Sequence, residues 1–268
     1  MGRYHFPIAL LAPRMPSFLI GQHRSLAQDI DHLFRAIDAA PQVINPDFIP
    51  AAEPFVLVMN HFHRSDIPSW WIAMAVLKAT AEHRSDSGAG SRLRLIVASQ
   101  WTYRAPLQRL IAEPLTRFMV GRIARAYDFL TIEPIALGAS AVTARAQSMR
   151  RILNAAHSAA RTHDILCLAP EGGDTRDGAL IHTPAGAGRF MLMLASAGLR
   201  FLPVGAYANA DTLIAAFGEP FQLSAPSNLR KSAADEWAAE QVMSRIAAML
   251  PLELHGAYRS DVEPLAAS

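Results

Sequence analysis

The sequence predicts a single α/β domain with a mainly parallel, mixed sheet flanked by helices. Three apolar runs suit buried strands, at residues 55–59, from Ile165 up to Pro170, and at 201–205, and longer stretches with helical spacing lie between and after them. Strands that alternate with helices are typical of a parallel sheet that helices cover on both faces. With 268 residues, 51% of them hydrophobic, the chain is long enough to bury one sizeable core.

The expected elements follow from local patterns along the chain. Residues 1–50 are interpreted as an N-terminal helical extension, with its clearest helix at 25–40, and residues 51–268 as the α/β domain. Pro68 lies in the first-turn region of an apolar helix predicted at 67–77. Polar, loop-like passages are expected at 81–91 and 224–235. Further helices are predicted at 141–161, 186–199 and 235–250.

Composition limits the environment that the chain suits. Its single cysteine, Cys167, lies in an apolar strand, which predicts an inert thiol and no disulfide framework. No apolar run approaches the roughly 20 residues that a membrane-spanning helix needs. The apolar run at 6–11 is too short for a secretory signal, so we expect a cytoplasmic protein. Peripheral contact of this N-terminal segment with the inner face of the membrane stays open; for Trp70 and Trp71, packing in the core is the preferred interpretation.

Positive charge is unevenly distributed although the net charge is only +2. Of the 25 basic residues 23 are arginine, and residues 84–151 hold 11 arginines against 4 acidic residues, a local excess of seven. Such a segment suits the phosphates of acyl-CoA, an acidic carrier protein or anionic lipid headgroups. A solvated face, or a general preference for arginine, explains it equally well. No nucleic-acid-binding motif is present, and nucleic acid is not an expected partner.

The most informative segment is residues 60–66, Asn-His-Phe-His-Arg-Ser-Asp, which follows the apolar run at 55–59. His61 and Asp66 are five positions apart, so they can meet only if the backbone turns between them. A strand, a turn and a helix would supply that geometry, with Ser65 or Asp66 capping the helix. A neutral imidazole can take a proton from an attacking hydroxyl, and a carboxylate on its other nitrogen would stabilise the imidazolium. No G-x-S-x-G nucleophile motif occurs, which favours a hydroxyl of the substrate as the nucleophile.

This segment resembles the HXXXXD signature of the glycerolipid acyltransferases, the group that includes lysophosphatidate acyltransferase. A second block, from Ile165 to Gly178, resembles the family's buried strand followed by Pro-Glu-Gly-Thr-Arg, and residues 201–205 resemble its closing valine-Pro-Val block. Residues 129–134 lie where the family has a strand that ends in Asp-Arg. Four blocks in matching order, over roughly residues 50–210, make the resemblance far more specific than one motif.

The resemblance implies an O-acyltransferase that moves a fatty acyl group from acyl-CoA or acyl-carrier protein to a hydroxyl of a glycerol phosphate, lysophospholipid or related lipid alcohol. It implies His61 as the general base and Asp66 as its partner, with no metal and no further cofactor. Asn60 would brace the turn. For Glu171 we favour a ligand contact, although a turn carboxylate bonded to backbone amides is the alternative. The residues expected to line the acceptor site are Asn60, Glu133, Glu171, Gly172 and Arg176.

The sequence departs from the family where the acceptor is recognised. Pro134 stands where relatives usually place an arginine that holds the acceptor's phosphate, and Gly173 and Asp174 separate Pro-Glu-Gly from Thr-Arg. The acceptor head group, the acyl-chain length, the choice of donor and the oligomeric state therefore stay open.

Two other classes of protein compete with this interpretation. His61, His63 and Asp66 partly match the H-x-H-x-D-H motif of a metal-dependent hydrolase, since two imidazoles one residue apart can share a metal. Asp66 is one position late and Ile67 stands where a further histidine is needed, which favours His63 as a residue that supports the catalytic residues from behind or packs in the core. The other alternative is a non-catalytic lipid-binding protein on an acyltransferase fold, because a fold does not guarantee an activity.

Overall fold

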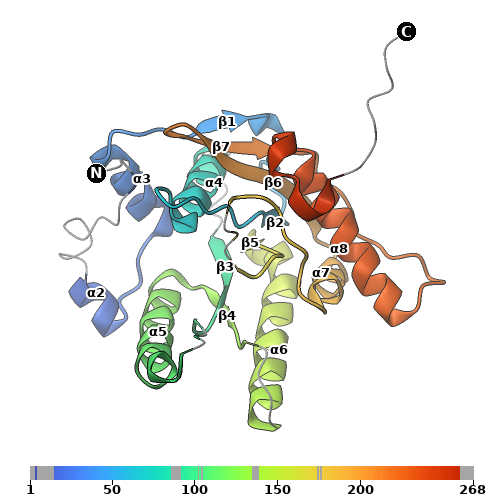
Figure 1. The fold of residues 1–268 in the computed structure, drawn as a ribbon, viewed down its shortest axis with the longest axis horizontal. Coiled ribbons are helices and arrows are strands. Elements are labelled where there is room, and N and C mark those ends of the chain that lie inside the picture. The colour runs from blue at the N-terminus through green and yellow to red at the C-terminus, as the bar shows by residue number, and fades with distance from the viewer. Residues whose placement is uncertain are drawn as a thin grey trace.

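The computed structural model describes most of the chain (Figure 1). The apolar run at 6–11, residues 86–91 of the predicted loop, Asp174 and Arg176 lie outside the described residues. The described residues are 4, 15–85, 92–101, 103, 105–134, 139–173, 175 and 177–259.

A seven-stranded sheet forms the centre of the described part of the chain, in the order β1-β7-β6-β2-β5-β3-β4. All neighbouring strands run parallel except the antiparallel pair β6 and β7. The predicted fold, a mainly parallel mixed sheet flanked by helices, is therefore confirmed. The strands are β1 (Gln42–Ile44), β2 (Phe55–Met59), β3 (Leu93–Ala98), β4 (Leu130–Ile132), β5 (Ile165–Leu168), β6 (Arg200–Asn209) and β7 (Thr212–Phe217).

Helices cover both faces of this sheet (Figure 1). Side chains of β2 alternate between two cores: Phe55, Leu57 and Met59 pack with α3 and α4, whereas Val56 and Val58 pack with α6, α7 and α8. Both faces of β2 are thus buried, which explains its uninterrupted apolar sequence. The helices are α2 (Met15–Ile20), α3 (Leu26–Ala36), α4 (Ser69–Ser85), α5 (Pro106–Tyr127), α6 (Ala139–Thr162), α7 (Ala187–Ala195) and α8 (Lys231–Ala247), with short 3-10 helices at Pro46–Phe48, Leu252–Leu254 and Gly256–Tyr258.

Several boundaries differ from those predicted, for local reasons. The helix expected from residue 67 begins at Ser69, because Arg64 and Ile67 exchange two backbone hydrogen bonds of 2.9 and 3.1 Å across a tight turn. Helix α8 begins at Lys231, four residues before the predicted start. The segment 1–50, interpreted as helical, includes strand β1, which pairs with β7. The division of the chain at residue 50 stays a prediction.

Core packing also accounts for two groups of residues singled out in the sequence. Trp71 is fully buried, and Trp70 stacks on it at 4.5 Å between ring centroids. Both tryptophans therefore pack in the core, which was the preferred interpretation of the sequence. Cys167 is buried in β5, and burial raises the pKa of its thiol, which agrees with an inert side chain.

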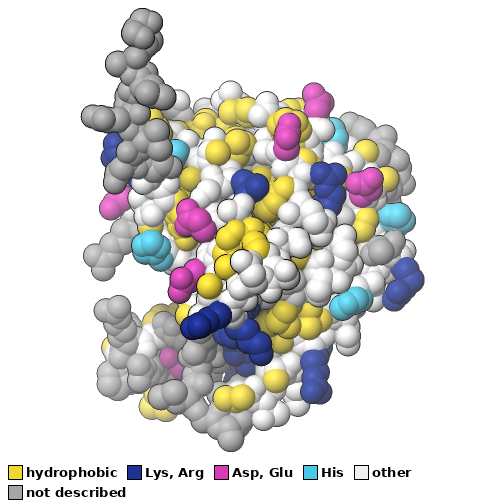
Figure 2. Space-filling model, turned by 90° about the vertical axis from the view of Figure 1, so that its right-hand side faces the viewer, with side chains coloured by type: hydrophobic (Ala, Val, Ile, Leu, Met, Phe, Trp, Pro, Cys, Tyr) yellow, Lys and Arg dark blue, Asp and Glu magenta, His cyan; other side chains and the backbone are white. Residues whose placement is uncertain are grey.

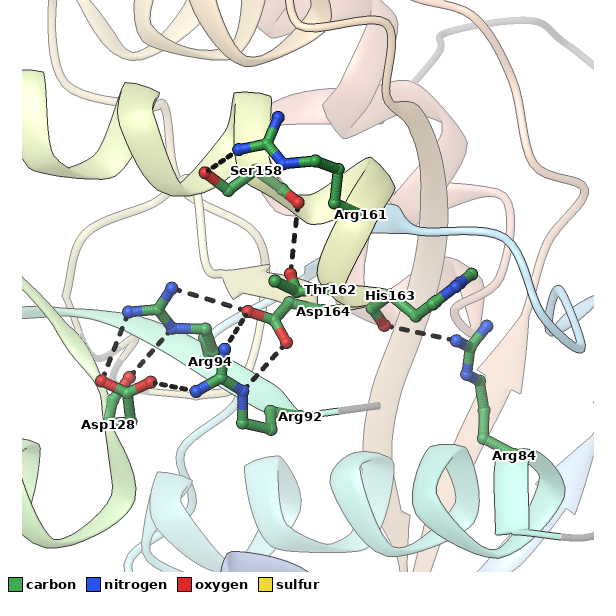
Figure 3. A network of polar contacts seen from close by, with 9 residues as sticks. All are labelled: Arg84, Arg92, Arg94, Asp128, Ser158, Arg161, Thr162, His163 and Asp164. Carbon is green, nitrogen blue, oxygen red and sulfur yellow. Dashed lines mark hydrogen bonds and ion pairs between the residues drawn. The ribbon is translucent and has the colours of Figure 1, made fainter. Parts of the chain in front are cut away.

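A network of charged residues fixes the amino ends of β3 and β5 (Figure 3). Asp164, just before β5, accepts hydrogen bonds from Arg92 at 3.0 and 3.1 Å. Asp128, just after α5, accepts from both Arg92 and Arg94. Arg84 is 3% exposed and donates to backbone carbonyls, including those of residues 50, 52 and 53. These three arginines of the predicted basic segment therefore stabilise the fold through internal pairing and do not form a free basic surface.

Candidate active site

The polar residues predicted to act lie at the carboxyl edge of the sheet. His61 follows β2, and Glu171 follows β5, which pairs with β2 in parallel. Serine, carboxylate and amide side chains after β2, β3, β4 and β5 share this edge, because the carboxyl ends of parallel strands lie together. In open α/β sheets this edge is the usual place for a ligand.

Glu171 connects the two motifs. Its Oε2 accepts a hydrogen bond from the backbone N–H of His61 at 2.6 Å, and its Oε1 accepts one from the backbone N–H of Ile181 at 2.9 Å. The side chain is buried, and burial raises the pKa of the carboxyl, while the two backbone hydrogen bonds oppose that rise. These contacts are those of a carboxylate that anchors backbone amides, the alternative that the sequence analysis ranked second. A direct contact of Glu171 with a ligand stays a prediction.

Packing of Phe62 also connects the turn after β2 to the segment after β5. Phe62 is 3% exposed, and its ring would lie only 2.5 Å from a Cβ atom at Gly178. Gly178 also has a positive φ of 77°, so two independent features favour glycine there. The turn after β2 is therefore held against the segment between Glu171 and Ile181 by hydrogen bonds and by packing.

Asn60 braces the start of the turn, as expected. Its side-chain oxygen accepts from the backbone N–H of Ala206 at 2.7 Å, and its side-chain nitrogen donates to the Ala206 carbonyl at 2.9 Å. These bonds continue the pairing of β2 with β6 one residue beyond the strand. Asn60 is 3% exposed, so the described contacts give it a structural role, and a contact with a substrate stays a prediction.

Asp66 is tied to its neighbour Arg64. The Arg64 guanidinium donates to Oδ1 at 2.6 Å and to Oδ2 at 2.9 Å, and also to the carbonyl of Ala210 at 2.7 Å. Hydrogen bonding to Arg64 lowers the pKa of the Asp66 carboxyl, which keeps it ionised. Asp66 lies in the turn three residues before α4, so it is not adjacent to the first residue of the helix, as a cap would be. Its expected bond to the imidazole of His61 stays a prediction.

Glu133 lies at the same edge, after β4. Its Oε2 accepts from the hydroxyl of Ser99, which follows β3, at 2.8 Å, and its Oε1 lies 3.6 Å from the guanidinium of Arg117 on α5. Arg145 on α6 donates to the backbone carbonyl of Glu133. Neither Ser99 nor Arg117 could be predicted from the sequence, because no local signal shows that β3 and β4 are neighbours.

Gly172 and His63 are the remaining described candidates near this edge. Gly172 has a positive φ of 69° in the turn after Glu171, and the residue is exposed to solvent. The ring Nδ1 of His63 is buried and has no hydrogen-bond partner among the described residues, and the role of His63 stays a prediction. In the described part of the chain no three His, Cys, Asp or Glu side chains are grouped so that they could hold a metal ion.

The fold and the site together define an α/β protein with a histidine and a buried glutamate at the carboxyl ends of adjacent parallel strands. The sequence model of the acyltransferase family matches residues 40–207, more than half of the chain, and the chain therefore belongs to the acyltransferase family. The family inferred from the motifs is confirmed.

Comparisons with single proteins add little to this assignment. No curated protein sequence gives a match. Among solved structures, the chain is similar to the 1-acyl-sn-glycerophosphate (LPA) acyltransferase PlsC from Thermotoga maritima, at 14% identity and a TM-score of 0.47, over 81% of this chain and 75% of that one. Within the described residues, no helix has both the length and the apolar character needed to cross a bilayer.

Proposed function

We propose that this protein is an O-acyltransferase that moves a fatty acyl group from acyl-CoA or acyl-carrier protein to a hydroxyl of a glycerol phosphate, lysophospholipid or related lipid alcohol. Membership of the acyltransferase family supports the reaction class. The observation that carries the proposal is the bond from the His61 backbone to buried Glu171, which joins the two motifs at the edge of the sheet. We also infer a cytoplasmic protein.

In this proposal His61 acts as the general base. Its imidazole takes the proton of the acceptor hydroxyl while the hydroxyl oxygen attacks the thioester carbonyl carbon. The C–S bond then breaks, the acyl group stays on the acceptor oxygen, and the thiolate leaves with the proton from the imidazolium. No acyl-enzyme forms. Backbone N–H groups of the turn hold the oxyanion, but that of His61 is not among them, because it donates to Glu171.

The alternatives have less support from the described residues. A metal-dependent hydrolase would need His61, His63 and Asp66 to converge, yet both oxygens of Asp66 accept from Arg64 and the His63 Nδ1 is buried. In a non-catalytic lipid-binding protein the bond from the His61 backbone to Glu171 would serve the stability of the fold alone. Activity measurements separate all three.

The test is acyl transfer from radiolabelled acyl-CoA, and separately from acyl-carrier protein, to lysophosphatidate, other lysolipids and phosphate-free lipid alcohols. Loss of a general base typically lowers the rate by about 10² to 10⁴, so His61→Ala should lose transfer by at least about a hundredfold. His157→Ala is the matched control, because His157 is an exposed histidine on α6. The metal content of the purified protein is measured on the same samples.

Each outcome decides between the classes. Transfer that disappears in His61→Ala and persists in His157→Ala supports the proposal and identifies the acceptor. Equal rates in wild type and His61→Ala would exclude His61 as the base. No transfer with any acceptor and either donor would favour the lipid-binding alternative, and stoichiometric bound metal with hydrolysis would favour the hydrolase.

A further inference from the structure

Helix α5 exposes a row of large apolar side chains. Leu110, Ile111, Leu115 and Phe118 are 75, 61, 58 and 46% exposed. Residues 111, 115 and 118 follow the i, i+4, i+7 spacing that puts side chains on one side of a helix. Apolar side chains of this size, gathered on one face, mark an interaction surface more often than scattered single residues do.

Trp101 is a further exposed aromatic residue beside α5. Its side chain is 62% exposed, and its backbone N–H donates to the hydroxyl of Thr116 at 3.4 Å, which places it beside the middle of α5. Tyr103 is fixed in the same way, because its backbone N–H donates to Glu113 at 3.1 Å. Trp101 and Tyr103 therefore lie beside α5, along the side of the helix that carries Glu113 and Thr116.

The charged residues of α5 are mostly positive. The helix holds four arginines, at positions 109, 117, 122 and 125, and Glu113 is its only acidic residue. The guanidinium of Arg122 lies over the ring of Phe118, 5.1 Å from its centroid, so positive charge borders the apolar row directly. By contrast, the face shown in Figure 2 has acidic, basic and histidine side chains interspersed.

The amino-terminal half of α5 lies on the side of the carboxyl edge of the sheet. Helix α5 starts beyond the carboxyl end of β3 and runs back to Asp128, which pairs with Arg92 and Arg94 at the amino end of that strand. Its first half, with Leu110 and Ile111, is therefore nearest the edge that carries His61 and Glu171. Figure 1 shows α5 at the periphery of the molecule, away from α7 and α8.

We propose that this surface docks on an anionic lipid bilayer and presents the carboxyl edge of the sheet to the membrane. We call it the α5 face and define it by Leu110, Ile111, Leu115, Arg117, Phe118 and Arg122. Apolar and aromatic side chains enter the interfacial region, while arginines meet lipid phosphates. A second copy of the chain fits less well, because two such arginine-bearing faces would repel each other. The inference adds to the proposed function a means by which a membrane-borne acceptor reaches the site.

The test measures binding to vesicles, without reference to catalysis. Vesicles of phosphatidylcholine alone are compared with vesicles that also contain phosphatidylglycerol, by co-sedimentation at low and high salt. The double variant Ile111→Ser, Leu115→Ser removes apolar area, and Leu252→Ser is its control, because Leu252 is also exposed, at 69%, outside this face. Arg122→Gln removes charge, and Arg35→Gln on α3 is its control, since the Arg35 side chain is 79% exposed.

The wild type should bind the anionic vesicles, and salt should weaken the binding. The double variant should bind at least about tenfold more weakly because of its lost apolar contact. Arg122→Gln should bind about fivefold more weakly, as expected for one arginine near an anionic surface. Both controls should bind as the wild type does.

Several results would overturn the proposal. These are no binding of the wild type to anionic vesicles, or equal binding by the double variant and the wild type. A dimer that becomes monomeric in the double variant, with vesicle binding unaltered, would assign the face to a second copy. The failure of the proposed function is separable, because His61→Ala should bind vesicles normally, and the double variant should still acylate a short-chain acceptor in free solution.

Discussion

Replacement of Glu171 by glutamine tests whether this carboxylate anchors the turn that carries His61. Glutamine keeps the shape of the side chain but has one acceptor oxygen in place of two. The N–H groups of His61 and Ile181 both point at Glu171, so one of them would face an NH₂ group and lose its acceptor. Both the stability of the protein and the position of His61 should change.

The size of the effect follows from the two hydrogen bonds. At 2.6 and 2.9 Å each is in the range of a charge-assisted bond, and such bonds contribute about 1.5 to 3 kcal/mol. Glutamine keeps one of them as a weaker neutral bond and leaves the other donor unpaired. It also removes the cost of burying a charge, which the raised pKa of Glu171 indicates. The net loss of unfolding free energy should be about 2 to 3 kcal/mol, with a lower urea midpoint.

Urea unfolding and steady-state transfer on the same samples separate anchoring from ligand contact. An anchoring carboxylate predicts a lower unfolding free energy together with a lower kcat, because His61 shifts. A side chain that only contacts the acceptor predicts a higher KM and unaltered stability. Glu253→Gln is the matched control, because Glu253 is exposed. The reasoning is refuted if Glu171→Gln unfolds within about 0.5 kcal/mol of the wild type, the usual range for a surface substitution.

Three further expectations follow from the same contacts. The pKa of Glu171 is raised above its ordinary 4.5, so the native state binds more protons than the unfolded chain just above pH 4.5. The unfolding free energy should therefore fall as the pH rises through this window. Urea titrations at several pH values should find a smaller fall in Glu171→Gln. Asn60→Leu should lower the unfolding free energy by about 2 to 4 kcal/mol in urea, since it leaves the N–H and C=O of Ala206 without their buried partner. If Asp66 orients His61, Asp66→Asn should lower kcat about a hundredfold. Arg64→Gln leaves the carboxylate in place and should lower kcat far less. Equal losses in the two variants would mean that the ion pair of Arg64 and Asp66 only stabilises the turn.

The sequence predicts the central strands well because their pattern is local. Strand β2 has the predicted bounds, since buried strands in a parallel sheet are apolar without interruption. Strand β3 escaped notice because Arg92 and Arg94, which belong to the ion-pair network, interrupt the apolar pattern around its start. Helix α5 escaped as well, since its apolar residues lie on its exposed side as well as its packed side. Strand β7 follows β6 through a turn at Ala210, which has a positive φ of 49° and carries no glycine or proline signal.

The site was predicted in composition but not in its contacts. The motifs identified His61 and Glu171, yet they favoured a ligand as the partner of the glutamate. Its observed partners are the backbone amides of residue 61, 110 positions away, and residue 181, 10 positions away. Backbone amides carry no residue-specific signal, so no pattern in a single sequence can show which of them a carboxylate will meet.

Residues at the carboxyl edge fall into two groups by what they contact, and this division bears on acceptor selectivity. Asn60 and Glu171 bond to backbone groups where the strand pairing ends, so a change at either position alters the framework before it alters specificity. Glu133 instead bonds to the side chain of Ser99 and lies near that of Arg117, which belongs to the α5 face. Side chains that bond to one another can be exchanged without unpairing the backbone. We therefore expect substitutions at Glu133 and Arg117, and not at Glu171, to change the choice among acceptor head groups.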